Sequence, residues 1–127
     1  RASSPKLQVH NNALLTALEN VGFEQARDDP EYWGRLVESS VGSHLVNQAR
    51  ASDVEVFYWR SANREVDFVL TRGAKVIAVE VKSTRRRTAT PGMEAFAKEF
   101  DVHKKLLVGG QGIPVEEFLT TDAAEWF

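Results

Sequence analysis

Apolar residues recur at two different periods along the chain, and the change of period separates a helical part from an extended part. Between about residues 31 and 50 they recur at spacings of three and four, which predicts a long amphipathic core helix. From residue 54 the period becomes two and the share of β-branched and aromatic residues rises, which predicts strands at 54–60, 65–71 and 75–82. The main helix is therefore expected to precede the sheet.

Shorter patterns predict two elements near the start of the chain. Residues 6–9 have the pattern of a small strand, and Asn11 or Asn12 would cap a helix over residues 13–18. Residues 19–30 contain glycine, proline and two adjacent aspartates, which favours a linker.

The pattern after the third strand decides the expected fold class. It predicts a helix at 91–100, a fourth strand at 104–108 and a helical turn within 114–119. Three consecutive strands followed by a helical crossover predict a mixed four-stranded sheet, with three antiparallel strands, a crossover strand and flanking helices. The expected class is α/β.

Composition limits the class of protein without naming a partner. At 127 residues the chain has the size of one domain, expected to span residues 1–127, and the absence of Cys excludes a disulfide scaffold or a thiolate zinc site. No apolar run approaches the roughly 20 residues that cross a bilayer and no signal-peptide pattern is present, so we expect a cytoplasmic protein without a membrane partner. With a formal net charge of −2, binding to nucleic acid would require a local basic patch.

The two strands at 65–71 and 75–82 bring charged residues together if Gly73 and Ala74 form the turn between them. In that register, paired residues have numbers that sum to 147, and one face is apolar. Its pairs are Val66–Val81, Phe68–Val79 and Leu70–Ile77. On the other face Asp67 would lie across from Glu80, and Glu65 across from Lys82.

Two facing carboxylates repel each other, so this arrangement predicts a cation that offsets the repulsion. Mg²⁺ and Mn²⁺ bind oxygen ligands of this kind, and a neighbouring ammonium group such as that of Lys82 stabilises negative charge that develops on a phosphate. The pattern therefore suits phosphodiester cleavage. The alternative is a solvent-exposed sheet face, on which an ion pair between Glu65 and Lys82 contributes almost nothing.

The spacing from Asp67 to Glu80-Val81-Lys82 resembles the motif of the PD-(D/E)xK nuclease superfamily, whose restriction-endonuclease-like core has the element order predicted above. More specifically, the chain resembles the carboxy-terminal domain of unknown function attached to prokaryotic AAA+ ATPases. The segments that carry this second resemblance are residues 4–7, 13–15, 34–38, 58–60, 65–69 and 79–83. Since the chain also starts without Met, we expect a piece of a longer protein whose N-terminal ATPase domain is its partner.

The resemblance implies a role for each motif residue. Asp67 and Glu80 would be metal ligands for Mg²⁺ or Mn²⁺, Lys82 the catalytic lysine, and Glu38 a helix-borne acidic residue that adds a ligand. Glu38 also stands near the inward side of its helix, where an unpaired carboxylate is costly, so a metal or a basic partner would relieve it. The alternative is a glutamate at the helix edge that reaches water.

A basic triplet follows the third strand. Arg85, Arg86 and Arg87 would lie where a phosphate backbone approaches the metal site. The alternative is a solvated basic loop or a docking surface for another domain. The expected function is a divalent-metal-dependent nuclease-like domain acting on DNA or RNA. The alternatives are a catalytically inactive module of the same fold that docks nucleic acid or protein, and a structural oligomerisation domain.

Overall fold

The computed structural model describes residue 25 and residues 28–83 and 90–127. They form α3 (Pro30–Arg50), β1 (Glu55–Ser61), β2 (Arg64–Arg72), β3 (Lys75–Val81), α4 (Pro91–Glu99), β4 (Lys104–Val108), α5 (Val115–Leu119) and the 3₁₀ turn η1 (Ala123–Trp126). The main helix, four strands, crossover helix and final helical turn are confirmed, with boundaries that differ by at most about one residue. The predicted strand at 6–9 and helix at 13–18 lie outside the described residues.

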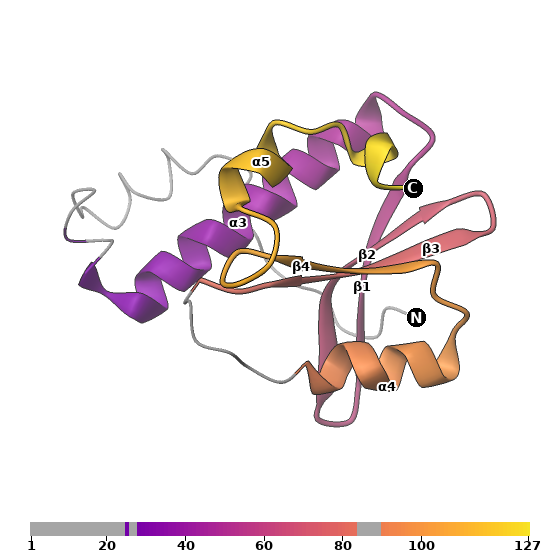
Figure 1. Cartoon of the computed structure of the whole chain (residues 1–127), viewed down its shortest axis with the longest axis horizontal. Coiled ribbons are helices and arrows are strands. Elements are labelled where there is room, and N and C mark those ends of the chain that lie inside the picture. Colours follow the sequence, from indigo (N-terminus) through magenta and orange to yellow (C-terminus); the bar gives the residue numbers. More distant parts are fainter. Residues whose placement is uncertain (1–24, 26–27, 84–89) are drawn as a thin grey trace.

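The four strands form one mixed sheet in the order β1-β2-β3-β4 (Figure 1). β1, β2 and β3 are antiparallel neighbours, and β4 runs parallel to β3 after the crossover through α4. The helices α3 and α5 lie on one side of the sheet and α4 lies on the other (Figure 1). The predicted α/β class, with three antiparallel strands and a crossover strand, is confirmed.

Local chemistry sets the start of α3. The side chain of Asp29 caps the helix by accepting a hydrogen bond from the main-chain N–H of Tyr32 at 3.2 Å. Pro30 occupies the first helical turn, where its missing N–H costs nothing, and Glu31 complements the positive end of the helix. These signals all stand in the sequence, so the helix boundary follows from it.

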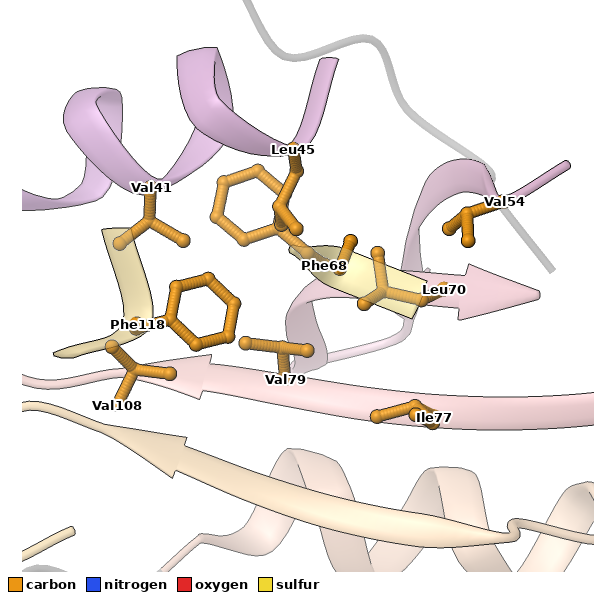
Figure 2. Close-up of a cluster of buried hydrophobic side chains, with 10 residues drawn as sticks. Val41, Leu45, Val54, Phe68, Leu70, Ile77, Val79, Val108 and Phe118 are labelled. Atoms are coloured by element: carbon orange, nitrogen blue, oxygen red, sulfur yellow. The ribbon is translucent and has the colours of Figure 1, made fainter. Parts of the chain in front are cut away.

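Two apolar clusters hold the layers together. The larger lies between the sheet and α3 with α5, where Val41 and Leu45 face Phe68 and Val79 across the interior, and Phe118 fills the space beside them (Figure 2). The smaller lies on the opposite face of the sheet. Its buried members are Trp59, Val66, Val69, Ala78, Met93 and Phe96. Because both faces are covered, the sheet has few polar positions in its middle.

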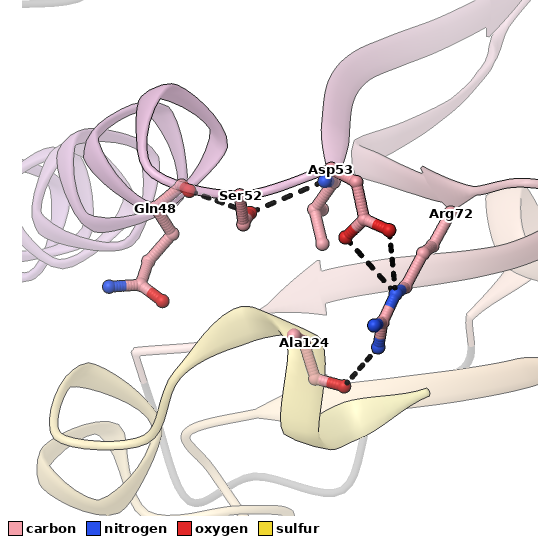
Figure 3. A network of polar contacts seen from close by, with 6 residues as sticks. Gln48, Ser52, Asp53, Arg72 and Ala124 are labelled. Atoms are coloured by element: carbon pink, nitrogen blue, oxygen red, sulfur yellow. Dashed lines mark hydrogen bonds and ion pairs between the residues drawn. The ribbon is translucent and has the colours of Figure 1, made fainter.

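Side chains from helix and sheet bind the main chain of the C-terminal segment. The main-chain N–H of Ala123 donates to Gln48 Oε1 at 2.9 Å, and Lys104 Nζ donates to the carbonyl of Trp126 at 2.6 Å. Arg72 pairs with Asp53 at 3.1 Å and reaches the carbonyl of Ala124 at 3.4 Å (Figure 3). The segment therefore closes the larger core.

None of the helices among the described residues combines the length and the apolar composition that a bilayer span requires.

Candidate functional site

An extra residue in β2 changes the direction of its side chains at the predicted site. Phe57 and Trp59 are two residues apart in β1, but their partners in β2, Val69 and Val66, are three apart. β2 therefore carries a β-bulge, with two residues, Asp67 and Phe68, opposite one residue of β1. Bulges of this kind re-aim a side chain next to a functional site or end a ladder.

The bulge overturns one predicted pair of the apolar face. Val66 packs with Val69 in the cluster under α4, whereas Phe68 and Val81 belong to the cluster under α3. The prediction that Val66 and Val81 share a face was therefore wrong. Its physical reason is the extra residue, which shifts the side-chain alternation of β2 by one position between residues 66 and 68.

The predicted register between β2 and β3 is correct up to the bulge. Every ladder pair from Phe68–Val79 to Arg72–Lys75 sums to 147, and Gly73 supplies a positive φ of 60° in the two-residue turn. The ladder ends at Phe68, so the predicted pairing of Asp67 with Glu80 across the ladder does not form.

Asp67 takes a place in the sheet that a main-chain carbonyl usually holds. Its Oδ2 accepts a hydrogen bond from the main-chain N–H of Val81 at 2.8 Å, across the strand boundary. The residue is only 8% exposed. A buried carboxylate with a main-chain donor is well compensated for its lost hydration, so Asp67 is held firmly at the point where β2 and β3 separate.

The side chains of Glu80 in β3 and of Lys82, directly after the end of β3, lie side by side, as predicted from their spacing. Lys82 Nζ and Glu80 Oε2 are 3.2 Å apart, and the side chains are 25% and 16% exposed. Lys82 therefore forms an ion pair with Glu80, two residues earlier in the chain, and not with Glu65 on β2. The second oxygen, Glu80 Oε1, is buried and finds no hydrogen-bond partner among the described residues. A buried carboxylate oxygen without a partner is costly and marks a place for a cation or a donor.

The main chain around Lys82 is held by the end of β4. The N–H of Lys82 donates to the carbonyl of Val108 at 2.8 Å. Gly109, at φ 79°, packs on the carbonyl oxygen of Lys82, which occupies the place that a Cβ would need. The sequence pattern did not predict this supporting role of Gly109. Its position directly after a strand was the available signal.

Glu38 continues the stripe of α3 that faces the sheet. Gly34, one turn earlier, would place a Cβ 3.2 Å from Ser83 Oγ at the end of β3, and Val41 and Leu45 further along are fully buried. Glu38 itself is half-buried. Glu38 therefore lies on α3 between the turn that contacts Ser83, after the end of β3, and the turns that enter the core.

The three predicted acidic ligands do not come together as one cluster. Alternation along β3 assigns Glu80 to the α4 side of the sheet, because Ala78 packs there, whereas Glu38 comes from α3 on the other side. Accordingly, the described part of the chain contains no group of three His, Asp or Glu side chains placed to hold a metal ion. The predicted phosphate contacts Arg85, Arg86 and Arg87 lie outside the described residues.

Comparison with known proteins gives a family and no activity. No curated protein and no solved structure matches the chain. A family model described as a domain of unknown function, DUF4143, matches residues 33–117, a span that includes all four strands, α4 and most of α3. Because the match covers well over half of the chain, this protein belongs to the DUF4143 family.

Proposed function

We propose that this domain hydrolyses phosphodiester bonds of DNA or RNA with the help of Mg²⁺ or Mn²⁺, as a nuclease-like part of a longer ATPase chain. The observation that carries the proposal is the buried Oε1 of Glu80, which has no hydrogen-bond partner in the described part of the chain and belongs to a carboxylate whose other oxygen pairs with Lys82. The order Asp67, Glu80, Lys82 and its resemblance to the PD-(D/E)xK motif support the same conclusion.

The residues present have the chemistry that a hard divalent cation requires. Asp67 and Glu80 supply carboxylate oxygens from the adjacent strands β2 and β3. The motif resemblance names Glu38 as a third carboxylate, but the structure does not bring it into one cluster with the other two. Asp67 and Glu80 would hold the ion. A bound Mg²⁺ supplies positive charge beside the scissile phosphate and activates water.

The chain's own residues would do the rest. Lys82 places an ammonium group at Glu80, where it can stabilise negative charge on a phosphate as that charge develops. The hydrogen bond from Val81 to Asp67 keeps one carboxylate oriented before any ligand binds, which lowers the cost of reorganisation. Arg85, Arg86 and Arg87 stand two, three and four residues after Ser83 in the chain and would attract the nucleic-acid backbone.

A second candidate is a catalytically inactive module that docks nucleic acid or protein for the ATPase. Two observations favour it. Asp67 already has a structural partner in Val81, and no third carboxylate or histidine joins the site among the described residues. In this case the Asp67, Glu80 and Lys82 arrangement stabilises the junction of the central strands β2 and β3, and binding depends on the arginine triplet.

Calorimetric titration with Mn²⁺ and Mg²⁺ separates the two candidates. The variants are Asp67→Asn and Glu80→Gln, which keep the shape of each side chain and remove its charge; Asn also keeps an acceptor for Val81. Glu65→Gln is the control, because Glu65 is an exposed carboxylate on the same strand as Asp67. Nuclease function requires that wild type and Glu65→Gln bind the ion and that both site variants lose at least about ten-fold in affinity, roughly the worth of one ligand charge. If the wild-type protein binds neither ion, the proposed metal site is wrong.

A cleavage assay then tests turnover. Labelled single-stranded and double-stranded DNA and RNA are incubated with Mg²⁺ or with chelator, using wild type and Lys82→Met. Metal-dependent cleavage that Lys82→Met abolishes supports hydrolysis by this site. Nucleic-acid binding without cleavage, lost when Arg85, Arg86 and Arg87 are changed together to Gln, supports the docking module instead.

A further inference from the structure

Lys82 and Glu80 form a pair that the strand itself holds together. They are two residues apart at the end of β3, with Lys82 directly after the last strand residue, and Nζ lies 3.2 Å from Oε2. Both side chains are mostly buried, at 25% and 16% exposure, which screens the pair less than an exposed one. Lys82 is thus the cation that Glu80 holds when nothing else is bound.

The backbone on either side of the pair leaves little freedom to separate the two groups. Glu80 is paired with Leu107 in the ladder between β3 and β4. Lys82 is fixed one step further by its hydrogen bond to the carbonyl of Val108 and by the close contact with Gly109. Any separation of the ammonium and the carboxylate therefore requires side-chain rotation rather than movement of the strand.

A divalent ion that binds Glu80 would meet this ammonium group. Of the two Glu80 oxygens, Oε1 has no hydrogen-bond partner among the described residues, and it belongs to the same carboxylate as the oxygen that pairs with Lys82. The two cations would then lie within a few ångströms of each other. Repulsion between a monovalent and a divalent charge about 5 Å apart changes affinity roughly ten-fold even at the dielectric constant of water.

We propose that Lys82 acts as a built-in competitor for the metal ion, so that the Glu80–Lys82 pair lowers the affinity of the site and sets the metal concentration at which it fills. This inference rests on the proposed metal site and adds a regulatory element to it. The positive charge of Lys82 would then have opposite effects on the two steps. It lowers the affinity for the metal ion, whereas it would assist a reaction at phosphate. A purely orienting role of Lys82 predicts the reverse for binding, because loss of the orienting group would weaken the site.

The test measures Mn²⁺ affinity of the 127-residue chain by electron paramagnetic resonance, without substrate. Lys82→Met removes the charge and keeps an unbranched apolar stem, and Lys82→Arg keeps the charge. Lys75→Met is the matched control, because Lys75 is an exposed lysine at the opposite end of the same strand. Circular dichroism and a urea unfolding curve verify that each variant is folded.

We expect Lys82→Met to bind Mn²⁺ roughly ten-fold more tightly than wild type, with Lys82→Arg and Lys75→Met within about two-fold of wild type. Equal or weaker binding by Lys82→Met, while Glu80→Gln still reduces the affinity of the wild-type site, would overturn the competitor role and leave the metal site intact. If no variant binds Mn²⁺, or Glu80→Gln binds as wild type does, the metal site itself fails and the inference fails with it. If Lys75→Met tightens binding as much as Lys82→Met, the effect is one of overall charge and the pair has no special role.

Discussion

The carboxylate of Asp67 accepts a hydrogen bond from the main-chain N–H of Val81 at 2.8 Å, and so closes the boundary between β2 and β3 where their ladder has ended. The same residue is the first acidic position of the candidate site. The side chain of Asp67 therefore has a structural role, as acceptor for Val81, and a proposed chemical role, as a metal ligand. Substitutions at this residue must be chosen to separate the two.

Replacement of Asp67 by Ala and by Asn is expected to separate these roles. Ala leaves the Val81 N–H without its acceptor, and a half-buried unpaired donor costs about 1–3 kcal/mol. Asn retains an acceptor oxygen and should lose less than about half of that. Urea unfolding monitored by tryptophan fluorescence measures both. Equal loss in the two variants would mean that the charge of Asp67, rather than its hydrogen bond, stabilises the sheet.

Gly109→Ala should destabilise the fold and disturb Lys82. A Cβ at Gly109 overlaps the carbonyl oxygen of Lys82, and the φ of 79° is unfavourable for any other residue. We expect a loss of about 2–4 kcal/mol in the free energy of unfolding, from overpacking and backbone strain together.

Gly73→Ala is the matched control for this loss. Gly73 also has a positive φ, of 60°, but a Cβ there would meet nothing within 4 Å. Its replacement should cost about 1–2 kcal/mol from backbone conformation alone. A Gly73 variant as unstable as the Gly109 variant would contradict the steric contact with Lys82.

Ala62→Gly should stabilise the protein. Ala62 lies in the turn between β1 and β2 with a φ of 53°, the left-handed region that disfavours a side chain. Relief of this strain, less the greater entropy of glycine in the unfolded chain, leaves a gain of about 0.5–1 kcal/mol. The measurement is the midpoint of thermal unfolding. Ala74→Gly in the other hairpin, where φ is not positive, should instead lower stability by a similar amount.

Phe118→Ala should be among the most damaging substitutions. Phe118 is fully buried, stacks on Trp126 with ring centroids 5.5 Å apart, and meets the ring of His44 edge-on at 5.8 Å. Loss of such a ring costs about 3–5 kcal/mol. Phe57→Ala, at a residue that is 42% exposed, should cost less than about 1 kcal/mol. Unfolding in urea compares the two, and a small effect at Phe118 would mean that the C-terminal segment detaches easily.

Much of the candidate site could be predicted because its determinants are local. Glu80 and Lys82 share a face for the simple reason that they are two residues apart on a strand. The register that sums to 147 follows from the turn at Gly73 and Ala74, which fixes the alignment of the strands that it joins. The position of Asp67 could not be predicted in the same way, because it depends on β1 as well as β3.

One signal in the sequence could have indicated the bulge. Residues 68, 69 and 70 are all apolar, so strict alternation already fails in the middle of β2. A strand with apolar residues at consecutive positions satisfies more than one register, since either face can be buried. For Gly109 the signal was its position directly after a strand, but its contact with Lys82 could not be predicted, because that contact arises between segments that are far apart in the chain.

The order of helices and strands, the cap of α3 and the spacing of Glu80 and Lys82 were determined by the sequence itself, through short-range patterns of capping, turn and alternation. The tertiary structure alone decided that β2 carries an extra residue, that Val66 turns toward α4, and that Glu38 approaches from the other side of the sheet. These outcomes depend on packing helices against both faces of the sheet at once. The favourable burial of two cores outweighs the loss of one regular ladder step, and no local pattern encodes that balance.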